Sequence, residues 1–248
     1  MFFRKIFKVL LILIYSAFGA FLTLFLWLIP VKKSVQLISR MTNLWGRGVA
    51  KILGMDICVK GNLKHPQSGY FIVSNHLSYL DIFAEATLFP VRYTPKSDIF
   101  WWPVAGWLVA ISRPIWIKRQ SRQFAKVANK KFKDTIEWGV SLIVYPEGTS
   151  SNGLAGILPF KSSVFEIPCA ENLPVLPILI SYPSMKRDEV CWYGDMLFFP
   201  HFWNVLGMKK INVLIYLFDP IYPSGLSRKE FSEKLNKMMN EKFKELYF

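Results

Sequence analysis

The stretch YFIVSNHLSYLD, residues 70–81, joins a buried-strand pattern to polar side chains that can carry chemistry. Its first part, residues 70–74, is an apolar run with β-branched members, which is typical of a strand covered on both faces. Asn75 and His76 follow directly, and His76 is one of only 3 histidines in the chain. Because α/β folds place ligands at the ends of their strands, the stretch predicts an α/β domain with a functional site after residue 74.

Beyond residue 55 the sequence alternates short apolar runs with helical segments. Such alternation predicts an α/β fold with a mostly parallel or mixed central sheet flanked by helices. The runs expected to form strands are 57–60, 70–74, 91–94, 114–118, 141–145, 175–181 and 211–218. The segments expected to form helices are 78–89, 120–138 and 226–245. We therefore expect one domain over residues 55–248.

Residues 1–54 lack the alternation of short apolar runs and helical segments, and their pattern predicts a membrane anchor. Residues 9–29 are almost all apolar, and at 1.5 Å per residue they are long enough to cross about 30 Å of hydrocarbon. A cleaved signal peptide is the alternative, but the run ends in Leu-Trp-Leu-Ile-Pro rather than in a small-residue cleavage site. Residues 34–54 have apolar side chains at helical spacing with Lys and Arg between them. This pattern suits an amphipathic helix, either in the headgroup layer or packed on the domain.

Charge and composition narrow the class of partner. Hydrophobic residues make up 52% of the chain, and 31 Lys and Arg against 17 Asp and Glu give a net charge of +14. A basic, apolar-rich chain suits nucleic acid or an anionic membrane surface, and the apolar N-terminal run favours the membrane. The cysteines, Cys58, Cys169 and Cys191, have neither metal-ligand spacing nor the even number of a complete disulfide framework. We expect no metal site and no nucleic-acid partner.

His76 and Asp81 are the candidate catalytic pair. In a strand-to-helix turn, Asp81 falls in the first helical turn, within reach of one nitrogen of the His76 ring. A carboxylate there fixes the tautomer and turns the other nitrogen outward, which supports a general base. The alternative is structural, because Ser78 and Asp81 match the S-x-x-D pattern of a helix capping box.

Further polar segments are weaker signals when taken singly. The stretch YPEGTSS, residues 145–151, follows an apolar run, and its glycine and hydroxyls suit either anion binding or a plain turn. The run 115–119 ends in two cations, Lys118 and Arg119, while Lys96 and Lys161 stand beside turns. Surface cations are usually solvated, so none of these positions identifies a site alone.

Four blocks nevertheless follow one another in a specific order. They are Asn75-His76-(four residues)-Asp81, Gly106 with Ile115-Trp116-Ile117-Lys118-Arg119, Tyr145-Pro146-Glu147-Gly148-Thr149, and Leu173-Pro174-Val175-Leu176-Pro177. In this order they resemble the motifs of the glycerolipid acyltransferase family, especially its bacterial 1-acylglycerol-3-phosphate acyltransferases. The resemblance runs from about residue 50 to 220. The first and third blocks, NHLSYLD and YPEGTSS, are highly specific as a pair.

The resemblance implies a reaction and a set of site residues. His76 would take a proton from a lysolipid hydroxyl, whose oxygen attacks the thioester of acyl-CoA or acyl-carrier protein as co-substrate, and Asp81 would orient His76. The catalytic domain would be residues 55–248 and would need no further cofactor. The residues implied in substrate binding are Asn75, Arg119, Glu147, Gly148, Thr149, Lys96 and Lys161.

Two departures from the family pattern concern the acceptor. Ser150 stands where the family often has an arginine, and Lys118 replaces a common acid. The expected acceptor is 1-acylglycerol 3-phosphate, giving phosphatidate, and the alternative is lyso-ornithine lipid or a lysophospholipid with a larger head group. A catalytically silent, basic membrane-surface protein is the non-enzyme alternative. The resemblance places the chain in phospholipid biosynthesis at a bacterial inner membrane, with the catalytic domain facing the cytoplasm.

Overall fold

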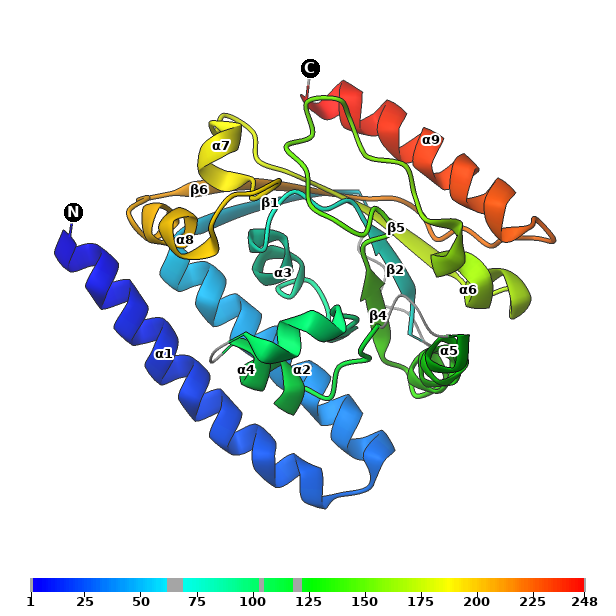
Figure 1. The fold of residues 1–248 in the computed structure, drawn as a ribbon, viewed down its shortest axis with the longest axis horizontal. Coiled ribbons are helices and arrows are strands. Elements are labelled where there is room, and N and C mark those ends of the chain that lie inside the picture. The colour runs from blue at the N-terminus through cyan, green and yellow to red at the C-terminus, as the bar shows by residue number, and fades with distance from the viewer. Residues whose placement is uncertain (1, 62–68, 103–104, 118–121, 248) are drawn as a thin grey trace.

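A six-stranded sheet forms the centre of the molecule (Figure 1). The computed structural model describes residues 2–61, 69–102, 105–117 and 122–247. The strands lie in the order β1-β6-β5-β2-β4-β3, and all neighbours are parallel except the antiparallel pair β5 and β6. They are β1 Met55–Gly61, β2 Phe71–Ser74, β3 Val91–Tyr93, β4 Ser141–Val144, β5 Val175–Ser181 and β6 Ile211–Leu217. The expected α/β fold with a mixed central sheet is therefore confirmed.

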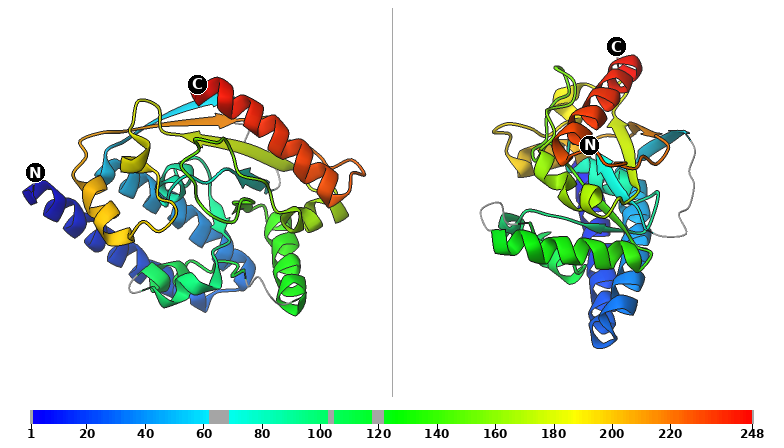
Figure 2. Two further views of the ribbon diagram at one scale, coloured as in Figure 1. Left: turned by 45° about the horizontal axis from the view of Figure 1, so that its top comes forward. Right: turned by 90° about the vertical axis from the view of Figure 1, so that its right-hand side faces the viewer.

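Helices cover both sides of the sheet (Figures 1 and 2). They are α1 Phe2–Phe25, α2 Val31–Leu53, α3 Leu80–Glu85, α4 Ala105–Ile111, α5 Arg122–Glu137, α6 Glu166–Ala170, α7 Arg187–Val190, α8 Phe198–Leu206 and α9 Arg228–Tyr247. Short 3-10 turns lie at Leu26–Leu28, Ser97–Trp101 and Ser162–Phe165. Helix α9 lies along one side of the sheet, and the pair α1 and α2 lies on the other. The core is consequently the layer between these helices and the sheet.

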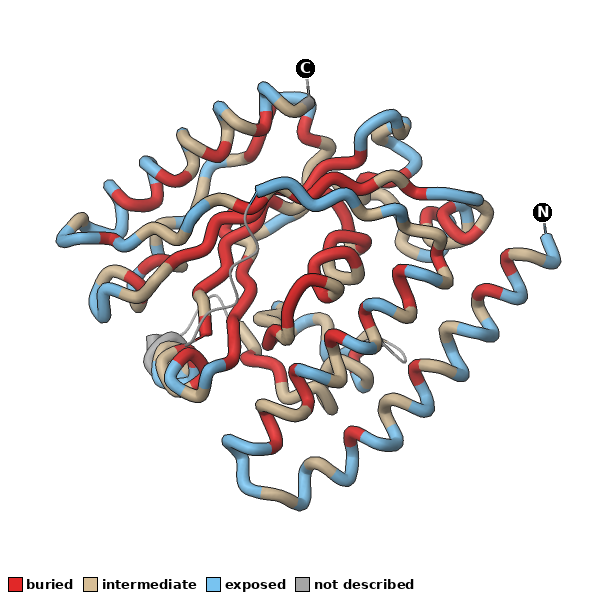
Figure 3. Tube along the Cα trace, turned by 180° about the vertical axis from the view of Figure 1, so that it is seen from behind, coloured by how far each residue is buried: buried red, intermediate tan, exposed pale blue. Residues whose placement is uncertain are grey.

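Three of the inner strands, β2, β4 and β5, bring their carboxyl ends to one edge. Every residue of β2, β4 and β5 is buried, because each strand has neighbours on both sides and helices on its faces (Figure 3). Strand β2 pairs in parallel with both β4 and β5. The loops after Ser74, Val144 and Ser181 therefore emerge side by side, where the sheet of an α/β fold binds ligands.

Helix α1 packs lengthwise against α2. The Lys8 ammonium donates to the carbonyls of Leu53 and Met208, at 2.8 and 2.9 Å, just where α2 and α8 end. Cations are favoured at helix C-termini, where carbonyl groups lack partners. By length and composition the segment Phe2–Leu28 is the one stretch of the described chain that could cross a membrane. Helix α2 buries residues such as Val35 and Ile38 against the domain, while the division into anchor and catalytic domain stays a prediction.

Two expected elements differ from the structure, and several helices were not expected. The expected strand 114–118 is wrong over its described part: Ile117 forms an isolated bridge with Lys96, and the chain enters from Arg113, whose φ is 50°. The expected helix 78–89 is limited to α3, because the residues before Leu80 form the loop around Asp81. Helix α8 was not expected, since its FFPHFW sequence has a proline inside and no polar face to reveal its period.

Candidate active site

His76 and Asp81 are in direct contact. The Nδ1 atom of His76 lies 2.8 Å from Oδ2 of Asp81, so the expected contact between the two side chains is present. The same Oδ2 accepts the backbone N–H groups of Leu77 and Ser78 at 2.7 and 2.9 Å, and the Tyr182 hydroxyl donates to Oδ1 at 2.6 Å. The Asp81 side chain is 0% exposed and that of His76 is 19% exposed. An imidazole that donates from Nδ1 to a carboxylate keeps its lone pair on Nε2, which makes Nε2 the candidate base.

The capping alternative for Asp81 describes only half of its contacts. The Asp81 carboxylate does accept the backbone N–H of Ser78, as a capping box requires. The reciprocal bond is missing, because the buried Ser78 hydroxyl oxygen has no hydrogen-bond partner within the described residues. Helix α3 begins at Leu80, and its N-cap, Tyr79, makes no side-chain capping bond. Asp81 therefore both orders the turn and holds the imidazole.

The loop after β4 is tied to His76 by its backbone. Oε1 of Glu147 accepts the backbone N–H of His76 at 2.6 Å, and the N–H of Ser151 donates to the His76 carbonyl at 3.0 Å. The second Glu147 oxygen accepts the backbone N–H of Leu158 at 2.8 Å. These bonds hold the two motifs NHLSYLD and YPEGTSS together across the sheet edge, although they are far apart in the sequence.

Glu147 is buried, and burial sets its charge. Burial, together with the nearby Asp81, raises the pKa of its carboxyl to about 8, although the N–H donors of Leu158 and His76 lower it. At neutral pH the side chain is therefore mostly protonated. Both of its oxygens face backbone N–H groups rather than the open edge, so what the structure shows is a brace, and the substrate-binding role stays a prediction.

Tyr145 packs against the ring of His76, and Tyr145 is in turn hydrogen-bonded to a second buried glutamate, Glu85. The His76 ring stacks on the Tyr145 ring, with centroids 4.1 Å apart and an interplanar angle of 19°. The Tyr145 hydroxyl donates to Oε2 of Glu85 at 2.6 Å. Our reading of the sequence missed Glu85, but one signal was available: an acid on the apolar α3, four residues after Asp81, lies on the same helix face.

Asn75 fastens β2 to β5. Its side-chain amide nitrogen donates to the Ile180 carbonyl at 3.0 Å, and its amide oxygen accepts the Ile180 N–H at 2.8 Å. The buried side chain thus mimics a peptide group and continues the sheet pairing beyond Ser74. This arrangement places His76 at a fixed height above the strand end, whereas the expected contact of Asn75 with substrate stays a prediction.

The remaining expected binding residues are scattered. Gly148, with φ of 71°, forms the turn of the YPEGTSS loop, a left-handed conformation that favours glycine, and Thr149 beside it is exposed. Lys161 is exposed, and its backbone N–H donates to the Pro146 carbonyl at 2.9 Å, so it belongs to the same edge. Lys96 is exposed next to the 3-10 turn at Ser97–Trp101. Arg119 lies outside the described residues.

An aromatic cluster adjoins the His76 loop. Tyr79 meets the rings of Trp192 and Phe198, with centroids 6.0 and 5.0 Å apart, and its hydroxyl lies 2.8 Å from Nδ1 of His201. The backbone N–H of Trp192 donates to the Leu77 carbonyl at 2.9 Å. Helix α8 and the segment before it therefore pack directly against the turn that carries His76 and Asp81.

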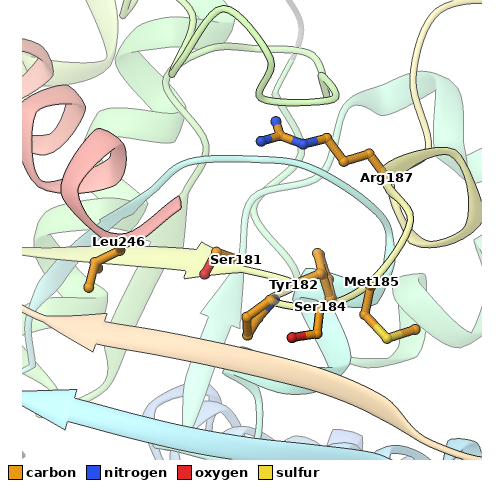
Figure 4. Close-up of a pocket in the computed structure, with 7 residues that line it drawn as sticks. Ser181, Tyr182, Ser184, Met185, Arg187 and Leu246 are labelled. Atoms are coloured by element: carbon orange, nitrogen blue, oxygen red, sulfur yellow. The ribbon is translucent and has the colours of Figure 1, made fainter. Parts of the chain in front are cut away.

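A cavity of about 290 Å³ opens beyond the end of β5 (Figure 4). Its lining includes Ser181, Tyr182, Ser184 and Arg187, with Leu246 from the end of α9. Tyr182 connects the cavity to Asp81 and His76 through its bond to Asp81. The Arg187 guanidinium donates to the carbonyl of Asn152 at 2.9 Å, which places a cation beside the YPEGTSS loop.

The arrangement suits proton transfer at Nε2 of His76. Within the described ranges, no group of three or more His, Cys, Asp or Glu side chains could hold a metal ion. What the edge offers is one oriented imidazole, a buried carboxylate partner and the backbone of the YPEGTSS loop. This combination of groups is typical of a general-base site.

The sequence and the fold are similar to those of known acyltransferases. Residues 56–181 match the model of the Acyltransferase family. The chain is 30% identical over 172 residues to the 1-acyl-sn-glycerol-3-phosphate acyltransferase of Neisseria meningitidis serogroup B, covering 68% of this chain and 67% of that protein. It is 28% identical over 211 residues to the lyso-ornithine lipid O-acyltransferase of Pseudomonas aeruginosa, covering 83% and 79%. Its fold is similar to that of a 1-acyl-sn-glycerophosphate (LPA) acyltransferase from Thermotoga maritima, with a TM-score of 0.68, 23% identity, and coverage of 98% and 97%.

Proposed function

The chain belongs to the acyltransferase family, and on that premise we propose that it moves a fatty acyl chain from an acyl thioester to the free hydroxyl of 1-acylglycerol 3-phosphate, giving phosphatidate. One observation carries the proposal. The bond between His76 and Asp81 is 2.8 Å long, and the backbone of His76 is tied to the YPEGTSS loop. A base and a potential substrate-binding loop thus share one edge of the sheet.

The proposed reaction balances without a covalent enzyme intermediate. Nε2 of His76 takes the proton of the acceptor hydroxyl while the acceptor oxygen bonds to the thioester carbonyl carbon. The tetrahedral intermediate then collapses, the C–S bond breaks, and the leaving thiolate takes the proton from the imidazolium of His76. The products are an ester and a free thiol, and the imidazole returns to its starting state.

Asp81 orients the base and stabilises the imidazolium. The backbone N–H groups of Leu77 and Ser78 and the Tyr182 hydroxyl hold its carboxylate, so it cannot swing away from Nδ1 without losing several hydrogen bonds. A positioned general base contributes about 10²–10⁴ in rate. The rest of the rate must come from placing the two substrates together and from stabilising the oxyanion.

The proposed acceptor substrate is supported by the names of the relatives and by the charged residues near the site. Relatives named for 1-acylglycerol 3-phosphate and relatives named for lyso-ornithine lipid both match over most of the chain. We favour the phosphate-bearing acceptor because the Arg187 guanidinium lies beside the YPEGTSS loop and the backbone of Lys161 is bonded to that loop, and two cationic residues suit an anionic head group. Lyso-ornithine lipid is the second candidate, because Ser150 supplies no cation of its own.

The proposal extends to the donor and the location. We propose acyl-CoA or acyl-carrier protein as the thioester and no further cofactor. The apolar segment Phe2–Leu28 supports attachment to a membrane, and we propose the inner membrane of a bacterium with residues 55–248 on the cytoplasmic side. A lysolipid acceptor would then reach the site from the membrane that holds the enzyme.

A substrate panel tests the proposal. Full-length protein in detergent is offered acyl-CoA or acyl-carrier protein together with lysophosphatidate, lyso-ornithine lipid or a lysophospholipid with a larger head group. We expect ester formation to be fastest with lysophosphatidate and to fall by about 10²–10⁴ in His76→Ala. A strong preference for lyso-ornithine lipid would replace the acceptor. Undiminished turnover by folded His76→Ala protein would remove the proposed base.

A further inference from the structure

The mechanism leaves one fully buried acid unused. Glu85, at the end of α3, is 1% exposed, and it contacts neither His76 nor Asp81 through a hydrogen bond. Its Oε1 is hydrogen-bonded to the Ser74 hydroxyl, and its Oε2 accepts a hydrogen bond from the Tyr145 hydroxyl. A buried carboxyl group with two side-chain partners, next to a catalytic histidine, calls for an explanation beyond packing.

The partners of Glu85 lead directly to the base. Tyr145 lies flat on the His76 ring, with centroids 4.1 Å apart. The hydrogen bond from Tyr145 to Glu85, 2.6 Å long, fixes the far end of the tyrosine. Ser74 is the last residue of β2, and its hydroxyl also donates to the carbonyl of Asn75 at 3.0 Å.

The two contacts of the imidazole restrain different motions. The hydrogen bond from Nδ1 to Asp81 fixes the position of one edge of the imidazole ring. A single hydrogen bond still allows the ring to rotate about the axis of that bond. The Tyr145 ring, stacked at 19°, removes this freedom by setting the plane of the imidazole. The direction of Nε2 is defined only when both contacts are present.

We propose that Tyr145 and Glu85 form a positioning pair, in which Glu85 anchors the Tyr145 hydroxyl so that the Tyr145 ring holds the His76 imidazole in the plane needed for proton transfer. This inference rests on the proposed function, since it assigns a task only if His76 is the base. Neither residue touches the reacting atoms, and both act through His76.

When Glu85 is protonated, the protons in this network have one consistent arrangement. A protonated Glu85 donates to the Ser74 oxygen, Ser74 donates to the Asn75 carbonyl, and Tyr145 donates to Glu85. Burial, together with the charge of Asp81, raises the pKa of Glu85 to about 8, although the hydrogen bonds with Ser74 and Tyr145 lower it. The titratable groups that face Glu85 are Asp81, Tyr93, Tyr145 and Tyr182.

Ionisation of Glu85 disturbs this arrangement. A carboxylate at Glu85 draws the Ser74 proton to itself and leaves the Asn75 carbonyl without it. Because Asn75 precedes His76 directly, the backbone that carries the base is then held less firmly. We therefore expect kcat to fall as the pH rises through about 8.

The test compares variants that keep or break the hydrogen bond between Tyr145 and Glu85. Tyr145→Phe keeps the stacked ring but loses the hydroxyl, and Glu85→Leu loses the acceptor. Each should lower kcat by about 10- to 100-fold with KM little changed, because a misplaced base slows chemistry and not binding. The double variant should lose little more than either single variant, since both remove the same contact. Exposed Tyr222→Phe is the matched control and should behave as the wild type.

The conservative variant separates positioning from mere stability. Glu85→Gln keeps an acceptor for Tyr145 and a donor for Ser74, so it should recover most of the kcat that Glu85→Leu loses. It cannot ionise, so it should also lack the fall in kcat near pH 8. Near-UV circular dichroism and thermal unfolding check that each variant is folded.

The outcomes distinguish this inference from the proposed function. If folded Tyr145→Phe and Glu85→Leu keep wild-type kcat while His76→Ala is inactive, the positioning pair is overturned and the base is retained. If wild type and Glu85→Gln share one pH profile, the role of Glu85 ionisation is overturned. If His76→Ala is fully active, the proposed function itself fails and takes this inference with it.

Discussion

In the loops that follow β2 and β4, buried polar groups meet defined partners, whereas the outward face of α1 presents large apolar side chains to its surroundings. Asp81, Glu147 and Asn75 are each held by two or more hydrogen bonds. On α1, by contrast, Phe3 is 86% exposed, and Leu28 just beyond the helix is 84% exposed. The polar side chains of Asp81, Glu147 and Asn75 have their hydrogen-bond partners within the protein, while the apolar side chains on the outward face of α1 are left exposed in the described structure.

The difference teaches which force shapes each region. Hydrogen bonds have direction, so the loops at the sheet edge hold side chains in defined orientations. Apolar contact has no direction, and an exposed apolar surface of this extent is typical of a membrane or protein contact. The helix meets the rest of the molecule through a few bonds on its inner side, among them those of Lys8, and Figure 3 shows its alternating buried and exposed positions.

The largest effect should come from the acid that orients the base. Asp81→Asn should lower kcat by about 10²-fold or more, because an amide can donate to Nδ1 and select the wrong tautomer. Ser78→Ala is the control for the capping reading, since its hydroxyl oxygen has no partner in the described structure, and the free energy of unfolding should change by less than about 0.5 kcal/mol. If Ser78→Ala destabilises the fold and Asp81→Asn keeps full activity per folded molecule, then Asp81 is a cap and not an orienting acid.

The next effect concerns the brace between the loops. Glu147→Gln cannot accept both backbone N–H groups, and leaving one of them unpaired should cost about 1–3 kcal/mol of stability. Chemical unfolding at neutral pH measures this loss. Glu137→Gln, exposed at the end of α5, is the matched control and should cost little. Equal stability of the two variants would mean that the Glu147 bonds are not what joins the loops.

The same side chain makes stability depend on pH. Because the pKa of Glu147 is about 8 in the folded protein and near 4.5 when unfolded, the folded state binds more protons between these values. Stability should therefore fall as the pH rises from about 5 to 8, by up to about 1.4 kcal/mol per pH unit for this group. Glu85, whose pKa is also about 8, acts in the same direction. Glu147→Gln should show a shallower slope, and an unchanged slope would contradict the raised pKa.

A smaller effect should follow from releasing α1 on its inner side. Lys8→Met keeps the length of the side chain but leaves the carbonyls of Leu53 and Met208 without their cation, at a cost of about 1–2 kcal/mol. Lys51→Met, exposed in the last turn of α2, should cost much less. Thermal unfolding in detergent compares the two, and equal melting temperatures would show that the Lys8 bonds do not hold α1.

The smallest effect on stability should come from the outward face itself. Phe7→Ser and Phe18→Ser, both on exposed positions, should change the free energy of unfolding in detergent by less than about 0.5 kcal/mol. The same change at the buried Phe231 should cost about 3–5 kcal/mol. Sedimentation with anionic lipid vesicles should nevertheless show weaker binding for the double variant of α1. Unchanged vesicle binding would place the membrane contact elsewhere.

The sequence was sufficient for the six strands of the sheet, although not for the seventh expected strand, and for the meeting of His76 with Asp81. Both follow from short-range patterns, namely apolar runs and a spacing of five residues across a strand-to-helix turn. It was not sufficient for the partners of Glu147, Asn75 and Glu85. Those bonds join backbone or side-chain atoms that are distant in the chain, so they depend on how β2, β4 and β5 are placed beside one another.

The expected strand at 114–118 failed for a related reason. Its apolar, β-branched composition fits a strand, and the outer side of β3 is open in the described sheet, but β3 itself ends at Tyr93. The segment runs past the end of β3 instead, where the N–H of Ile115 donates to the Tyr93 carbonyl and that of Ile117 to the Pro95 carbonyl. Amino-acid composition indicates which conformation a segment favours, whereas strand formation also depends on the neighbouring strand with which the segment can pair.

Helix α1 is fastened near both of its ends, by Lys8 to the chain around Leu53 and Met208, and by the Trp27 indole to the Ile111 carbonyl at 2.9 Å. Because it is attached near both ends, α1 is held in a fixed position relative to the rest of the molecule. The distance between α1 and the His76 imidazole is therefore set by the fold. A lysolipid drawn from the bilayer would have to rise by that fixed distance, so the depth of the head group, and not only its charge, would decide which acceptors can be used.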